Sequence, residues 1–189
     1  DRMLTAYGLM EFSDMGRVYA IDEAIIDRAA AWLLAQQAGD GSWENDQGLV
    51  HEQSWSNLGN ARLPVTAYIV WALTEAGYDD ETGTQRGLDY VRELWRDAED
   101  PYALALVANA LVAADPEGGA TEQALDALAD MAQIEGNGAY WKSGVATFMG
   151  ATGDTGSIET TALAAYAFLS SGEHTDLANQ ALTYLIQQK

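Results

Sequence analysis

The chain has 189 residues, of which 48% are hydrophobic, and this length and composition suit one globular domain with a substantial core. It contains no cysteine, so neither a disulfide framework nor thiolate chemistry is available within it. Acidic residues outnumber basic ones by 29 to 9, and the net charge of −20 disfavours nucleic acids and anionic membranes as partners.

The apolar residues follow a helical spacing almost throughout, and no segment shows the sustained alternation of a half-buried strand. The fold class is therefore predicted to be all-α. The sequence predicts eight helices, which in chain order occupy residues 2–14, 21–37, 64–77, 81–97, 101–114, 119–134, 157–171 and 174–188.

The predicted helices alternate between two kinds. One kind is apolar on nearly every side, as in "YALALVANALVAAD" at 102–115, which is typical of helices packed on two sides. The other kind is amphipathic, as in "TDLANQALTYLIQQ" at 175–188. Such a pair buries its apolar face only by stacking on further pairs, which indicates a repeat of roughly 40–50 residues. Either an open helical solenoid or a double ring of inner and outer helices satisfies this pattern.

The connection after the second predicted helix contains "AGDGSW" at 38–43. Gly39 is expected to supply a left-handed helix cap and Gly41 a tight turn, and Trp43 is expected to fill the seam between neighbouring helices. The chain ends in "YLIQQK" at 184–189, at the matching point of another amphipathic helix. We therefore expect a fragment of a larger ring.

Residues 37–43 form the turn pattern Gln-x-x-Asp-Gly-x-aromatic, which occurs in several families of alpha/alpha toroids. These families include terpenoid cyclases, protein prenyltransferases and some polysaccharide-active enzymes. The more specific segments are "LTAYGLMEF" (4–12), "DEAIIDRAAAWLLAQQAGDGSW" (22–43), "LVHEQSWSNLGNARLPVTAYIVWALTEAG" (49–77), "GAYWKSG" (138–144) and "GSIETTALAAYAFL" (156–169). Their order and spacing cover nearly the whole chain. In this order they resemble one family of alpha/alpha toroids, the complement-like, thioester-containing domain of bacterial-type alpha-macroglobulins.

This resemblance implies that residues 1–189 form an incomplete double ring of the terpenoid cyclase and prenyltransferase type. It implies part of a protease inhibitor that traps its targets covalently through an internal thioester. The Gly-Cys-Gly-Glu-Gln motif that forms the thioester in the family is absent, so it is expected upstream in the parent protein. The implied partners are proteases and other domains of the same chain, without nucleic acid or membrane contact by this fragment. The implied location is periplasmic or extracellular, with an envelope anchor in the parent, and neither enzymatic turnover, a cofactor nor a metal is expected.

His51 is the candidate reactive residue. In complement-like members a histidine at the matching place attacks the thioester first, and a neutral imidazole is a nucleophile near pH 7. Glu52 and Gln53 are candidate orienting groups for this imidazole. The alternative for all three residues is an ordinary solvated loop.

The sequence also allows two alternative functions. The first is a toroid enzyme, such as a polysaccharide lyase or a terpene cyclase, and the second is a helical-repeat binding module without chemistry. The acids of "YDDET" at 78–82 follow Gly77 in a connector, which disfavours the acidic cluster of a terpene synthase. His174 is expected to be a solvated helix-end residue. Four tryptophans are interpreted as core residues rather than carbohydrate platforms: Trp43, Trp55, Trp71 and Trp141.

Overall fold

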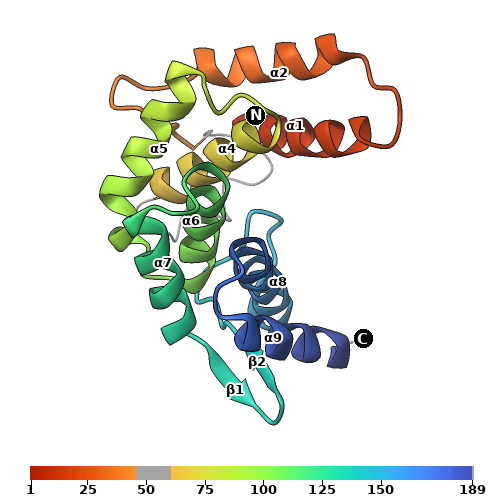
Figure 1. The fold of residues 1–189 in the computed structure, drawn as a ribbon, viewed down its shortest axis with the longest axis vertical. Helices are drawn as coiled ribbons and strands as arrows, with labels where there is room; N and C mark the ends of the chain where they lie inside the picture. The colour runs from red at the N-terminus through yellow and green to blue at the C-terminus, as the bar shows by residue number, and fades with distance from the viewer. Residues whose placement is uncertain (46–60, 189) are drawn as a thin grey trace.

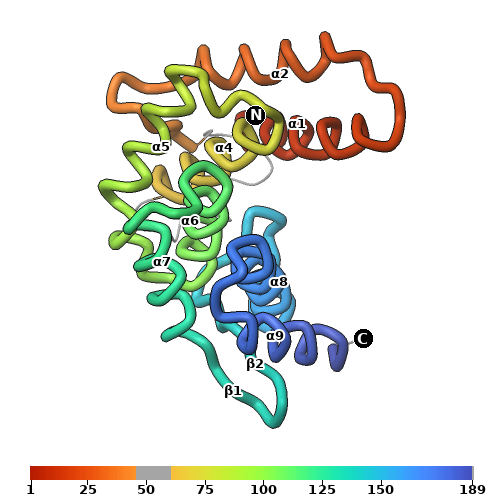
Figure 2. Tube along the Cα trace, viewed as in Figure 1, coloured from red at the N-terminus to blue at the C-terminus, as the bar shows by residue number. Residues whose placement is uncertain are grey.

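In the computed structural model, which describes residues 1–45 and 61–188, helices form two layers that curve into an open arc (Figures 1 and 2). Successive helices of the inner layer pack side by side: α1 (Arg2–Gly16), α4 (Arg62–Glu75), α6 (Pro101–Ala114) and α8 (Gly153–Ser171). The outer layer contains α2 (Glu23–Ala35), α5 (Thr82–Leu94), α7 (Gly119–Asp130) and α9 (Thr175–Gln187). The predicted all-α fold, with alternating inner and outer helices in an incomplete ring, is confirmed.

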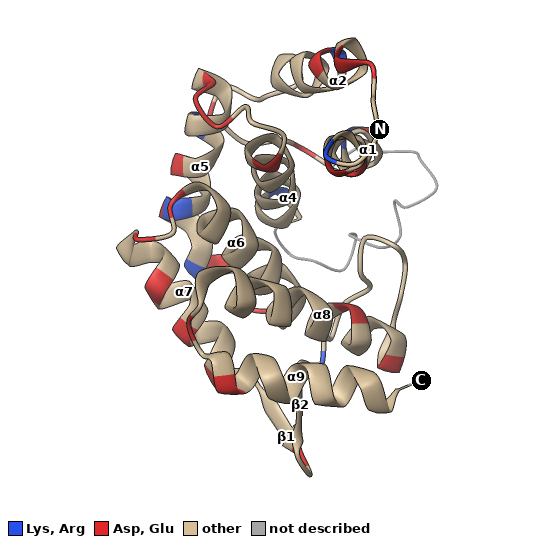
Figure 3. Ribbon diagram, turned by 45° about the vertical axis from the view of Figure 1, so that its right-hand side comes forward, with Lys and Arg blue, Asp and Glu red and all other residues tan. Residues whose placement is uncertain are grey.

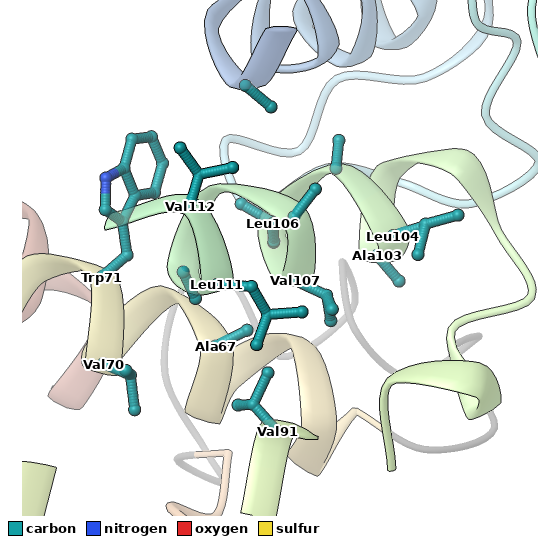
Figure 4. Packing of buried hydrophobic residues seen from close by; sticks show 14 of the residues in the cluster. Ala67, Val70, Trp71, Val91, Ala103, Leu104, Leu106, Val107, Leu111 and Val112 are labelled. Atoms are coloured by element: carbon teal, nitrogen blue, oxygen red, sulfur yellow. The ribbon is translucent and has the colours of Figure 1, made fainter. Parts of the chain in front are cut away.

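The core lies along the two central inner helices. Ten of the 14 residues of α4 and eleven of the 14 residues of α6 are buried, as expected for helices that are apolar on every side. Figure 4 shows side chains of α4 and α6 meeting there, with Val91 reaching the same place from α5. The terminal inner helix α1 differs, because it buries Met3, Ala6 and Leu9 on one face and leaves much of its other apolar surface exposed.

A glycine allows the outer helix α5 to approach this core closely. A Cβ atom at Gly87 would lie 2.6 Å from the Trp43 ring and 2.7 Å from Cγ2 of Val70. Any larger residue would therefore push α5 away from α4. The close contact between α5 and α4 at this point therefore requires glycine at position 87.

Two tryptophans reveal the internal repeat directly. Trp43 and Trp141 are both fully buried, and each follows an outer helix and precedes an inner one. Each backbone N–H donates to a threonine hydroxyl of the next inner helix, and each indole N–H donates to a carbonyl of the preceding outer helix. The distances are 2.9 Å to Thr66 and 2.7 Å to Leu33 for Trp43, and 3.1 Å to Thr161 and 2.6 Å to Leu128 for Trp141.

The turn before Trp43 differs from the expectation at one glycine. Gly41 has a φ of +89°, whereas Gly39 is not among the residues with positive φ. The left-handed position therefore comes inside the turn and not at the helix cap, because α2 already ends at Ala35 and Gln36 caps it with right-handed geometry. Asp40 completes the turn by accepting hydrogen bonds from the backbone N–H and the hydroxyl of Ser42.

Several predicted boundaries are also corrected. The helix predicted at 119–134 ends at Asp130, and an antiparallel hairpin of β1 (Gln133–Glu135) and β2 (Gly138–Tyr140) follows it. Ile134 continued the helical spacing, yet its side chain is 61% exposed. Strands of three residues are too short to show alternation. The helix predicted at 81–97 becomes a 3-10 turn from Trp95 onward, and α8 begins four residues earlier than expected.

Candidate functional site

The three predicted site residues, His51, Glu52 and Gln53, lie outside the described residues. The described ends of their connection are held together at the start of α4. Arg62, the first residue of that helix, pairs with Asp40 at 3.1 Å and also with Glu44. Hydrogen bonds from Ser42, together with the Arg62 charge, lower the pKa of Asp40. The described residues on the two sides of the gap therefore lie beside the N-terminal end of an inner helix.

The connection between α7 and α8 also reaches the N-terminal end of an inner helix. Asp100 caps α6 by accepting from the backbone N–H of Tyr102 at 2.9 Å. The same carboxylate accepts from the Ser143 hydroxyl at 3.0 Å and from the backbone N–H of Gly144 at 2.8 Å. These bonds tie the connection of residues 131–152 to the start of α6.

A pocket of about 180 Å³ lies between all four inner helices, and we call it the inner-layer pocket. Each of α1, α4, α6 and α8 contributes two lining residues spaced three or four positions apart, the spacing at which side chains share one helix face. The lining is mostly apolar. Its aromatic and charged members are Tyr7, Tyr68, Trp71, Tyr102, Phe148 and Glu159.

Glu159 carries the charged group of the inner-layer pocket. The hydroxyl of Thr147 donates to its Oε2 at 2.6 Å, and the hydroxyl of Tyr102 donates to its Oε1 at 3.3 Å. The Tyr102 hydroxyl in turn accepts from the backbone N–H of Phe148 at 2.9 Å. Within residues 1–45 and 61–188, no arginine, lysine or histidine forms an ion pair with Glu159.

The aromatic lining is partly ordered by ring contacts. Tyr68 lies edge-on to Trp71, with 6.1 Å between ring centroids, and Phe148 also lies 6.1 Å from Tyr68. Burial raises the pKa of Tyr68, and the nearby Tyr7, Glu11 and Glu159 raise it further. Burial likewise raises the pKa of Tyr102, with the Glu159 charge as the next contribution. Both phenols are therefore neutral over the physiological range.

Sequence reasoning did not find the inner-layer pocket. Trp71 is buried, as predicted, but it also lines this pocket. The available signal was Glu159, an acid within the otherwise small and apolar stretch "TTALAAYAFL" that follows it. Trp43 and Trp141 are confirmed as core residues, and Trp55 lies outside the described residues.

The structure also shows the positions of two candidates from the sequence, the acidic connector at 78–82 and His174. Asp79 and Asp80 are exposed in the connector between α4 and α5, and no group of acids, histidines or cysteines in the described part of the chain could hold a metal ion. His174 is the N-cap of α9, a helix-end residue as expected, but it is not simply solvated. Its Nε2 lies 2.8 Å from a carboxylate oxygen of Asp126, and its ring contacts Phe168. No helix of the described residues is long and apolar enough to cross a bilayer.

Comparison with known proteins places the chain in a family. The family model described as A-macroglobulin TED domain matches residues 2–189. Thioester-containing protein 1 of Anopheles gambiae is similar, with 27% identity for allele S1 and 26% for allele R1, each over 176 residues or 89% of this chain. Complement C3 of Lethenteron camtschaticum is 23% identical over 151 residues, or 74% of this chain.

The chain spans only 12% of the length of the Anopheles proteins and 9% of that of the Lethenteron protein. The family model, by contrast, covers all but the first residue of this chain. The two-layer arrangement of α1 to α9 agrees with this match along its whole length. The chain belongs to the A-macroglobulin TED domain family.

Proposed function

We propose that this chain is part of the thioester domain of an alpha-macroglobulin-like protein that binds its targets covalently. The observation that carries the proposal is the family match over residues 2–189. The similar proteins, named thioester-containing protein 1 and complement C3, support it. In the proposed reaction a target hydroxyl or amine attacks the thioester carbonyl, the C–S bond breaks, and an ester or amide forms as the thiol leaves.

The thioester itself must come from another part of the parent protein, because this chain has no cysteine. We therefore propose that residues 1–189 are a fragment of the domain and that further helices carry the Gly-Cys-Gly-Glu-Gln motif. Apolar surface at the ends of the arc supports this. The exposed apolar residues are Leu4, Phe12 and Met15 on α1, and Leu169, Leu182 and Ile186 on α8 and α9.

Within this domain, His51 is proposed to attack the thioester before the target does. The imidazole nitrogen would form an acyl-imidazole and release the cysteine thiolate, and a target hydroxyl would then displace the imidazole. Glu52 and Gln53 would orient the ring through a hydrogen bond. The described residues before and after the gap support this role, because Asp40 and Glu44 pair with Arg62 at the start of α4.

The fragment is proposed to act as a scaffold without turnover. Its partners would be the other domains of the parent chain, and the targets of the parent would be proteases, caught after cleavage of a bait region elsewhere in it. A periplasmic or extracellular location, with an anchor in the parent, fits such targets. Neither a cofactor nor a metal is needed for thioester transfer.

The test uses the full-length parent protein and its His51→Ala variant. Thioester formation, measured as one thiol released per chain by methylamine, should be the same in both. Coupling should shift in the variant from labelled glycerol toward labelled methylamine, because the acyl-imidazole route favours hydroxyl groups. An unchanged ratio of the two labels would remove the proposed role of His51. Absence of any methylamine-released thiol in the parent would remove the thioester proposal itself.

A further inference from the structure

We propose that the inner-layer pocket binds a compact alkylammonium cation, such as the head group of choline. This proposal concerns non-covalent binding by the described residues, so it does not depend on the thioester. The juxtaposition that carries it is one carboxylate, Glu159, among aromatic side chains from three inner helices and the α7–α8 connection.

The aromatic lining provides the first part of the site. The face of an aromatic ring carries negative electrostatic potential and attracts cations that approach within about 6 Å. Tyr68 and Trp71 meet edge to face with centroids 6.1 Å apart, so their rings present surfaces in different directions. The ring of Phe148 also contacts Tyr68, with 6.1 Å between the two ring centroids. A cation in the inner-layer pocket therefore meets rings on more than one side.

Glu159 provides the second part. Thr147 and Tyr102 both donate hydrogen bonds to its carboxylate and hold it in place. Within residues 1–45 and 61–188, no cationic side chain balances the charge of this carboxylate beside its two hydroxyl donors. A positive ligand would supply the missing counter-charge in surroundings of low polarity, where a charge pair is stronger than in water.

Size and polarity select the kind of cation. A volume of about 180 Å³ suits a small head group. A primary ammonium or a metal ion would lose hydration that an apolar lining cannot replace, whereas a quaternary ammonium is weakly hydrated and covered by methyl groups. The net charge of −20 attracts free cations and opposes a phosphate attached to the same head group. Free choline should therefore bind better than phosphocholine.

The experiment titrates the purified chain with tetramethylammonium, choline and phosphocholine at constant ionic strength. The observed signal is the indole N–H of Trp71 in ¹H–¹⁵N NMR spectra, assigned with a Trp71→Phe variant. Tetramethylammonium and choline should shift this signal saturably, and phosphocholine should bind more weakly. The neutral carbon analogue of choline, 3,3-dimethyl-1-butanol, should bind at least about tenfold more weakly than choline.

Two variants and one matched control separate the site from general charge effects. Glu159→Gln and Tyr68→Leu should each weaken choline binding by about tenfold while leaving the weak binding of the alcohol unchanged. Asp154→Asn removes an equal charge from the exposed first turn of α8 and should change nothing. If Glu159→Gln fails to fold, the choline affinity of Tyr68→Leu and the comparison of choline with its neutral analogue still test the proposal.

Three results would overturn the proposal. The first is equal binding of choline and its neutral analogue, and the second is the absence of a saturable shift with tetramethylammonium. The third is an equal effect of Asp154→Asn and Glu159→Gln, which would reduce the site to nonspecific attraction. None of these results bears on whether the parent protein forms a thioester.

Discussion

Gly41 and Gly77 have nearly the same positive φ in very different surroundings. Their φ values are +89° and +83°, a region in which residues other than glycine are strained. A Cβ atom at Gly41 would lie 2.5 Å from the carbonyl oxygen of Arg86, whereas a Cβ atom at Gly77 would meet nothing within 4 Å. The two glycines therefore separate backbone strain from steric overlap.

We expect Gly41→Ala to destabilise the chain more than Gly77→Ala. Both substitutions incur the left-handed strain of about 1–2 kcal/mol. Gly41→Ala should lose about 1–3 kcal/mol more, because the turn must move away from α5. Urea unfolding followed by circular dichroism measures the two differences. Equal losses would show that the turn moves away from Arg86 without cost.

At the scale of elements, carboxylates at helix starts differ in how many segments they join. Asp22 caps α2 and accepts one backbone hydrogen bond, from Ala24 at 3.1 Å. Asp100 caps α6 in the same way, but it also accepts from Ser143 and Gly144 in the connection that leads to α8. One side chain thus organises both a helix and the long connection beside the inner-layer pocket.

Asp100→Ala is therefore expected to cost more stability than Asp22→Ala. Loss of a helix cap alone costs about 1 kcal/mol, which is the expectation for Asp22→Ala. Asp100→Ala also leaves the Ser143 hydroxyl and the Gly144 N–H without their charged acceptor, so about 2–4 kcal/mol is expected. Denaturant midpoints give the comparison. Hydrogen exchange should speed up in residues 141–152 only for the Asp100 variant, and a uniform change along the chain would contradict the joining role.

For the whole molecule, two properties act against each other. The net charge of −20 makes copies of the chain repel one another, and Figure 3 shows acidic residues along the outer helices α2, α5 and α7. The ends of the arc, in contrast, expose large apolar side chains such as Leu4 and Phe12 of α1 and Ile186 of α9. Exposed apolar surface of this kind favours association.

We expect the purified chain to self-associate with increasing concentration, and more strongly in salt. Raising the salt from about 20 mM to about 500 mM shortens the range of the repulsion but leaves the apolar attraction intact. Light scattering should therefore report a higher average mass at high salt. Leu182→Glu with Ile186→Glu should lower it, whereas Asp79→Asn, in an exposed connector, should not. A constant monomer mass across these conditions would contradict the prediction.

The two helical layers of this protein are predictable from its amino-acid pattern. Ala-rich helices without a polar face, such as α6, have to be buried on two sides, and amphipathic helices such as α9 have to cover them, so the inner and outer assignment follows from hydrophobic burial alone. Trp43 was also predictable, because a large aromatic after a tight turn fits between helices. The resemblance in motif order anticipated the family.

The inner-layer pocket and the details of the connections, in contrast, arise from contacts between segments that are distant in the sequence. Glu159 is separated from Tyr102 by 57 residues and from Tyr68 by still more, and no local pattern shows that they share a cavity. The strands of the hairpin after α7 have three residues each, which is too short for an alternation of apolar and polar residues to be recognised. Likewise Gly41, and not Gly39, takes the left-handed position, because α2 already ends at Ala35, and the turn packs closely against the backbone of Arg86. Such features depend on which surfaces meet once the helices have packed, and that information is not contained in any single segment.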